Sequence, residues 1–296
     1  MEDYIRARAC QIFLGRYTRL PIVESLSFDR NLETMRFDSF YFVSQAAPLR
    51  CLATNRSTGH GKRLPMIEHR PFASLHAEEH GWLQARHHIF WNRRTGPDSW
   101  GALCAWNDDE IAPNSGFPSH AHANMEIITY VRDGLITHRD NLGNTGHIHA
   151  GDVQVMSAGT GIRHAEYNLE RTPARLFQIW IVPDRAGGAP AWGTKSFPKN
   201  DRAGQFVPLA SGFEQDVDAL PIRSRARVLG ATLRAAEKLD YAFEAGRMGY
   251  LVATGGSLEI NGTRLDARDG AAIKEVELLD VQALQDVELV LVDVPA

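Results

Sequence analysis

The segments 119–126 (SHAHANME) and 161–168 (GIRHAEYN) decide the fold of this chain. His120 and His122 lie two residues apart in the first segment, as do His164 and Glu166 in the second. Because side chains two apart on a β-strand project from the same face, two such strands side by side would aim three imidazoles and one carboxylate at a common point. This ligand set suits a first-row divalent metal and leaves a coordination position open. The sequence therefore predicts a metal site.

The sequence around these segments has the texture of an all-β protein. From Met66 onward, Gly, Asn, Asp and Pro separate short runs rich in Val, Ile, Leu and aromatic residues, such as 125–134 (MEIITYVRDG), 151–159 (GDVQVMSAG) and 175–183 (RLFQIWIVP). Regular short strands with turn signals are typical of a sandwich or barrel, and a double-sheet jelly roll is the natural candidate. Asn261-Gly262 is a strong hairpin signal.

Two changes of texture predict the domain boundaries. A Pro/Gly-rich stretch at 183–198 favours a division into an N-terminal β-module, 66–198, and a C-terminal one, 199–296. Residues 1–65 hold neither the helical nor the strand period for long, so we expect a poorly ordered extension or a segment upstream of a natural start at Met66. The alternative is a short genuine extension that packs on the body through its aromatic cluster, Phe40, Tyr41 and Phe42.

Composition excludes several classes of protein. The 296-residue chain has a hydrophobic fraction of 44% and a net charge of −4, which is ordinary for a globular protein and gives no basic footprint for nucleic acid or an anionic membrane. Three scattered cysteines do not make a disulfide framework, and no apolar run approaches the roughly 20 residues of a membrane helix. We expect a cytoplasmic protein.

Two spaced motifs carry a family resemblance. Gly116-x3-His120-x-His122-x3-Glu126-x7-Gly134 resembles the first cupin motif, and Gly151-x5-Ser157-x-Gly159-x4-His164-x3-Asn168 resembles the second, with Ser157 where proline is usual. Within the cupins, 66–88, 100–122 and 147–168 are similar to the pirin family of two-domain cupins, and most of all to bacterial pirin-like proteins with quercetinase activity. The similarity covers 66–296 and does not extend to 1–65. The glycines are expected to turn the chain tightly between strands.

The resemblance implies a fold and a metal centre. The fold would be an all-β, two-domain cupin, or double-stranded β-helix, with the metal in the N-terminal domain. No histidine follows His164, so the C-terminal domain is expected to be degenerate and without metal. One divalent metal per chain would be held by His120, His122, His164 and Glu166. Fe(II) is favoured, with nickel, copper, zinc and manganese as alternatives. Glu166 would also act catalytically, by accepting a substrate proton.

Other side chains have less specific interpretations. Glu126 has a structural role as its first interpretation and metal contact as its second. His147 and His149 are expected near a solvated turn, His138 is expected to be exposed or hydrogen-bonded, and Cys104 is expected to be a small buried side chain. His87 and His88 are expected at a strand edge or the domain interface. Five residues are expected to form apolar walls for a flat aromatic ligand: Phe117, Met125, Ile127, Met156 and Phe177.

Three functions stay open at this stage. The leading one is a metal-dependent dioxygenase that cleaves a flavonol-like aromatic such as quercetin with O2. The alternative is a metal- or redox-sensing regulatory protein that acts through a protein partner, because the acidic net charge argues against direct binding to nucleic acid. A small-molecule isomerase is the third, since one fold hosts several activities.

Overall fold

The computed structural model describes residues 64–92, 96–97 and 99–296. All of these lie in one compact unit, 42–296. The interpretations of residues 1–65 therefore fall almost wholly outside the described residues. Within the described part, the helical segments are two short 3-10 turns, η3 (Phe72–Ser74) and η4 (Lys199–Arg202), and no helix there is long and apolar enough to span a membrane.

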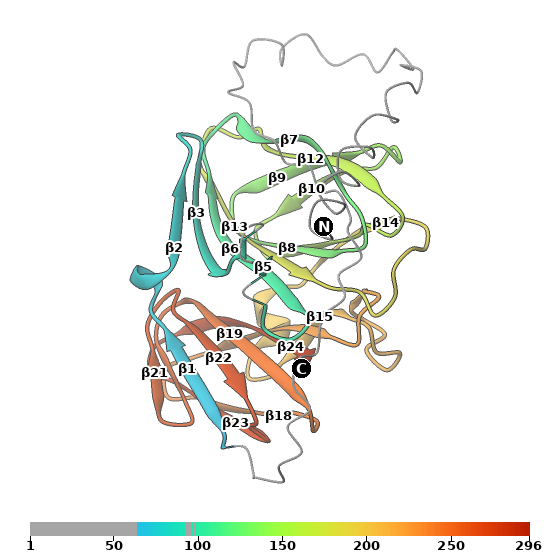
Figure 1. Ribbon diagram of the computed structural model, residues 1–296. Helices are drawn as coiled ribbons and strands as arrows, with labels where there is room; N and C mark the ends of the chain where they lie inside the picture. The colour runs from blue at the N-terminus through green and yellow to red at the C-terminus, as the bar shows by residue number, and fades with distance from the viewer. Residues whose placement is uncertain (1–63, 93–95, 98) are drawn as a thin grey trace, which may run out of the picture. The chain divides into compact units, whose positions relative to one another are not determined.

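Two antiparallel sheets build the first module (Figure 1). The larger contains, in spatial order, β14 (Ala191–Ser196), β11 (Asp152–Ser157), β8 (Glu126–Asp133), β13 (Ala174–Ile181), β6 (Leu103–Ile111), β3 (Leu83–Ile89) and β2 (His76–Glu79). The smaller contains β10 (Thr145–His149), β9 (Leu135–Asp140), β12 (Ile162–Asn168) and β7 (Ser115–His122). Gly134 and Gly151 adopt positive φ angles of 80° and 91° at the ends of strands, as expected of turn glycines.

The second module repeats this arrangement, except for one parallel strand pair at the edge of its larger sheet. Its larger sheet contains β1 (Met66–Arg70), β22 (Gly270–Lys274), β19 (Arg247–Gly255), β24 (Val287–Pro295), β17 (Arg227–Leu233), β15 (Val207–Ser211) and β16 (Leu220–Pro221). Its smaller sheet contains β18 (Lys238–Ala242), β23 (Leu278–Ala283), β20 (Leu258–Ile260) and β21 (Thr263–Leu265). The Asn261-Gly262 turn joins β20 to β21 as predicted, with Ile260 opposite Thr263. A further pair of two-residue strands, β4 (Trp91–Asn92) and β5 (Gly96–Pro97), completes the fold.

The first strand of the chain is exchanged between the modules. β1 precedes the first module in sequence, yet it pairs along its whole length with β22 of the second, from Met66 opposite Lys274 to Arg70 opposite Gly270. A sequence boundary near 198 does not anticipate this exchange, because the pairing partner lies about two hundred residues further along the chain.

Alternation along the strands divides the apolar side chains into separate cores. One core contains residues of both large sheets, including Trp106 and Phe177 from the first module and Tyr250 and Val292 from the second. Another core lies within the second module. The interior of the first module has two clusters, built around Ile136 and Ile127. The polar groups of the predicted metal site lie in this interior of the first module.

Candidate metal centre

Strand pairing brings the two decisive segments together. β7 and β12 are antiparallel neighbours, with His120 opposite His164 and His122 opposite Ile162. The other edge of β12 pairs with β9, which places Glu166 opposite His138. The register shifts between His164 and Glu166, and such an irregularity re-aims side chains within one strand.

A glycine makes the close approach of these strands feasible. A Cβ on Gly116 would meet the backbone of Glu166 and Tyr167 on β12. The motif led us to expect Gly116 in a turn, but it lies inside β7. Its role is to leave room for the backbone of β12, because it has no side chain.

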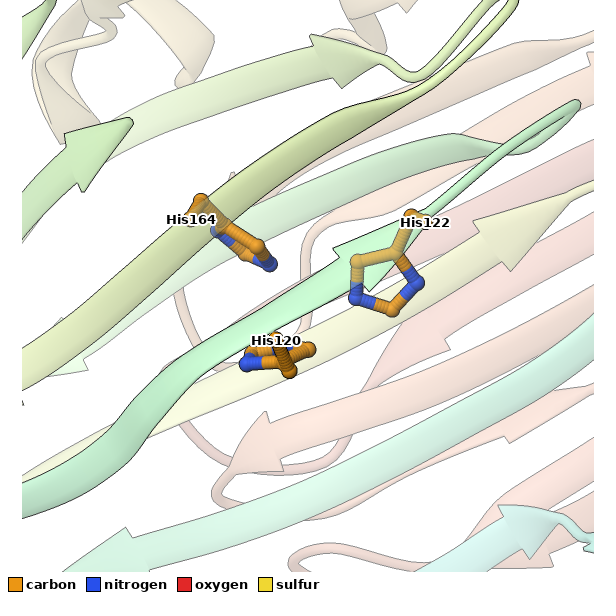
Figure 2. Close-up of side chains that lie close together, drawn as sticks. All are labelled: His120, His122 and His164. Carbon is orange, nitrogen blue, oxygen red and sulfur yellow. The ribbon is translucent and has the colours of Figure 1, made fainter. Parts of the chain in front are cut away.

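The three imidazoles gather as the sequence predicted (Figure 2). Their ring centroids are 4.8 Å apart for His120 and His122, 4.5 Å for His120 and His164, and 5.1 Å for His122 and His164. One ligating nitrogen from each ring can be chosen so that all lie within 4.8 Å of one another. His122 and His164 are buried, whereas His120 is half-buried and forms the more open side.

The electrostatics of these rings favour metal binding. Burial lowers the pKa of His122 to about 3, and it lowers the pKa of His164 well below the ordinary histidine value and that of His120 below it. The rings are therefore neutral at physiological pH and keep a lone pair on one nitrogen. His120 Nδ1 lies 2.7 Å from the backbone oxygen of Pro118, so Nδ1 carries the proton and Nε2 the lone pair. Neither nitrogen of buried His164 has a hydrogen-bond partner.

Glu166 is held by amide donors from the opposite sheet. Its Oε1 accepts a hydrogen bond of 2.6 Å from Gln154 Nε2 and one of 3.3 Å from Thr129, and its Oε2 accepts one of 2.6 Å from Gln178 Nε2. Trp192 Nε1, which can only donate, lies 2.8 Å from Gln154 Oε1. That contact fixes the orientation of the Gln154 amide and directs its NH2 group at the carboxylate. We call Gln154 and Gln178 the glutamine clamp.

Glu166 groups differently from the single cluster that the sequence predicted. Among the described residues, two sets of three side chains have ligating atoms within 4.8 Å of one another: His120, His122 and His164, and His138, His164 and Glu166. The four predicted residues thus lie next to one another in space, and His164 belongs to both sets. His138 was expected to be exposed or hydrogen-bonded; it is hydrogen-bonded to Asp140, but it is fully buried beside the site. The i, i+2 spacing of His138 and Asp140 was the signal that could have singled it out.

The positions of the remaining polar side chains agree with the predictions, but the reasoning for Glu126 changes. His147 and His149 are exposed and belong to neither group. Glu126 likewise belongs to neither; it accepts a 2.5 Å hydrogen bond from Ser157 and keeps a structural role. Its alternation with His122 is broken because Asn124, between β7 and β8, has a positive φ of 52°. Cys104 is buried, and burial raises the pKa of its thiol to about 12.

The predicted apolar walls are partly wrong. Met125, Ile127 and Met156 form one buried cluster in the interior of the first module, together with half-buried Trp180. Trp180 lies 5.1 Å from the His122 ring, edge to face. Phe117 packs on the neighbouring cluster, within 6.3 Å of the His120 ring.

Phe177 does not line the site. It belongs to the core shared by the two large sheets, because its neighbour Gln178 is the residue of β13 that faces Glu166. The interface interpretation of His88 is confirmed: it is buried there, 3.3 Å from the hydroxyl of Tyr250. His87 lies 2.8 Å from Asn107 on the adjacent strand.

Comparison with known proteins agrees with this architecture. Residues 67–181 match the Pirin family, and residues 209–294 match the quercetinase C-terminal cupin domain. A pirin-like protein of Caulobacter vibrioides is 62% identical over 230 residues, which make up 77% of this chain and 99% of that protein. The chain belongs to the pirin family.

Other pirins extend the comparison. The quercetin 2,3-dioxygenase of Escherichia coli is 34% identical over 219 residues, covering 73% of this chain and 93% of that protein. The crystal structure of the bacterial pirin YhhW from Escherichia coli in complex with nickel(II) superposes with a TM-score of 0.72 and 32% identity, over 78% of this chain and 99% of that one. The predicted two-domain cupin fold is confirmed.

Proposed function

We propose that this pirin is a metal-dependent dioxygenase that cleaves a flavonol-like aromatic, such as quercetin, with O2. The observation that carries the proposal is the buried His164 ring, whose two nitrogens have no partner although it lies 4.5 Å and 5.1 Å from two other neutral imidazoles. A buried polar group without a hydrogen bond is costly, and a metal ion would satisfy this one. The names of the Escherichia coli relatives, a quercetin 2,3-dioxygenase and a pirin in complex with nickel(II), support the same proposal.

The donor set fits one divalent cation per chain. His120, His122, His164 and Glu166 would hold it, and when bound it would supply Lewis-acid positions for a hydroxylated aromatic and for O2. Fe(II) is the cation we favour, with nickel, copper, zinc and manganese as alternatives, because imidazole-rich sites bind several of these tightly. The two candidate ligand groups of the described residues both lie in the first module, so the second module would hold no such ion.

The protein's own groups would handle the proton and exclude water. Glu166 would accept the proton of a substrate hydroxyl, while the glutamine clamp keeps both carboxylate oxygens oriented during the transfer. Buried Met125, Ile127 and Met156 surround the interior with apolar surface, which suits a flat aromatic and disfavours hydrolytic side reactions. His120, the least buried histidine of the three, marks the side from which a substrate would enter. We place this chemistry in the cytoplasm.

Turnover of quercetin tests the proposal. The protein is loaded under anaerobic conditions with Fe(II), Ni(II), Cu(II) or Mn(II), then given quercetin and air while flavonol absorbance and carbon monoxide release are followed. We expect metal-dependent loss of absorbance, abolished in His164→Ala and retained in His147→Phe, which changes an exposed histidine outside both groups. If no metal supports turnover, the dioxygenase proposal is wrong.

A further inference from the structure

The second group of ligating atoms calls for a separate explanation. His138, His164 and Glu166 offer atoms within 4.8 Å of one another, and all three side chains are almost fully buried. His138 lies on β9 and faces Glu166 across the strand pair. It lies outside the set of four ligands proposed above.

The contacts of His138 resemble those of a metal-binding histidine. Its Nε2 lies 3.1 Å from the Oδ2 atom of Asp140, and its Nδ1 is buried without a partner. A ligating histidine commonly donates its other N–H to a carboxylate, which fixes the tautomer and raises the basicity of the ligating nitrogen. With Nε2–H donating to Asp140, the lone pair of His138 lies on the unpartnered Nδ1.

The supporting groups around His138 are themselves held in place. Asp140 Oδ1 accepts hydrogen bonds from the backbone N–H groups of Leu142 and Asn144 at 2.9 Å and 3.0 Å, and its Oδ2 accepts one from the Asn144 amide at 2.9 Å. On its other side the His138 ring stacks on Trp192, with centroids 5.1 Å apart and planes at 16°. The ring is therefore fixed in orientation by a carboxylate at its edge and an indole on its face.

We propose that His138, His164 and Glu166 form an inner position for the divalent cation, an alternative to the outer position at His120, His122, His164 and Glu166. This inference rests on the metal site of the proposed function but not on its dioxygenase activity. A neutral imidazole has one lone pair, so His164 serves one position at a time. The chain would bind one cation, distributed between two positions that share His164 and Glu166.

Removing the outer position isolates the inner one. Full-length protein carrying His120→Ala and His122→Ala is titrated with Co(II), and the stoichiometry and Kd are measured by chelator competition. We expect one Co(II) per chain with an affinity at least about 10-fold below that of the wild type, because losing ligands costs no less than losing the groups that orient them, and no binding once His138→Phe is added. Phenylalanine keeps a flat ring for Trp192 to stack on and removes Nδ1; His147→Phe is the matched control.

A spectroscopic experiment covers the case in which the double variant does not fold. Wild-type protein loaded with one equivalent of Cu(II) should give two electron paramagnetic resonance signals, of which His138→Phe removes one and His147→Phe removes none. A single wild-type signal that survives His138→Phe would overturn the inference, as would a folded double variant that binds no Co(II). Protein that shows both positions but leaves quercetin intact would refute the dioxygenase proposal alone.

Discussion

The glutamine clamp makes the sharpest prediction about this pirin, through Gln178→Leu. The Gln178 amide is buried and donates a hydrogen bond of 2.6 Å to Glu166 Oε2. Leucine has nearly the same volume, so the interior should keep its packing while the carboxylate loses its donor on that oxygen. Oε1 keeps its contacts to Gln154 and Thr129.

The size of the effect follows from the charge on the acceptor. A hydrogen bond to a charged group contributes about 1.5–3 kcal/mol. At about 1.4 kcal/mol per tenfold change in an equilibrium constant, the loss corresponds to a divalent metal bound about 10- to 100-fold more weakly. The same range is typical when a group that orients a metal ligand is removed.

Chelator competition with Co(II) measures this change directly. Gln84→Leu is the control, because Gln84 is exposed on β3 of the same sheet and should leave the Kd unchanged. Denaturant unfolding of both variants confirms that the fold persists. A Gln178→Leu protein that is folded and binds Co(II) with wild-type affinity would refute the reasoning that the clamp orients Glu166.

Three further predictions concern packing and charge. Gly116→Ala should weaken metal binding by separating β7 from β12, seen as a raised Co(II) Kd; an unchanged Kd would contradict the close-approach argument. Trp106→Ala should lower the free energy of unfolding by about 3–5 kcal/mol in denaturant, because it empties part of the core between the large sheets, whereas a loss near zero would contradict that packing. Burial alone would raise the pKa of Glu288, but Tyr130, Lys199 and Arg202 lower it below 4.5. The ionised Glu288 therefore stabilises the fold at neutral pH, and this stabilisation is lost as the pH falls below 4.5 through the folded-state pKa. The Glu288→Gln variant should have a lower free energy of unfolding at neutral pH, and that free energy should fall less steeply than the wild-type value as the pH is lowered. Equal slopes for the two proteins would contradict this prediction.

The convergence of the three histidines was predictable in the part that depends on local information, the spacing within each motif. The i, i+2 spacing of His120 and His122 fixes the strand face that this pair occupies, whereas the register shift between His164 and Glu166 changes where Glu166 points. The order of the two motifs then places these strands close together. The hairpin at Asn261-Gly262 was predictable for the same reason, since a two-residue turn sets its own register.

The features that sequence reasoning missed depend on register between distant strands. Phe177 and Gln178 are adjacent in sequence, and only the pairing of β13 with β8 and β6 decides which of them faces Glu166. Register shifts occur on β12 and on β13, and each resets the alternation on which a count from the sequence relies. The closeness of His138 to the site was missed because it depends on the pairing of β9 with β12, which places His138 opposite Glu166. The exchange of β1 was missed because its partner strand is in the second module.

The second module supports the metal centre although it contributes none of the proposed ligands. β13 carries Gln178 on the face toward Glu166 and Phe177 on the opposite face, where Phe177 packs 5.5 Å from Trp106. Trp106 in turn lies 5.5 Å from Tyr250 of the second module. Because close-packed interiors resist local displacement, this aromatic core fixes the strand from which Gln178 reaches Glu166. The degenerate module is thus a structural part of the site, since it backs the sheet that orients Glu166, the one carboxylate among the proposed ligands.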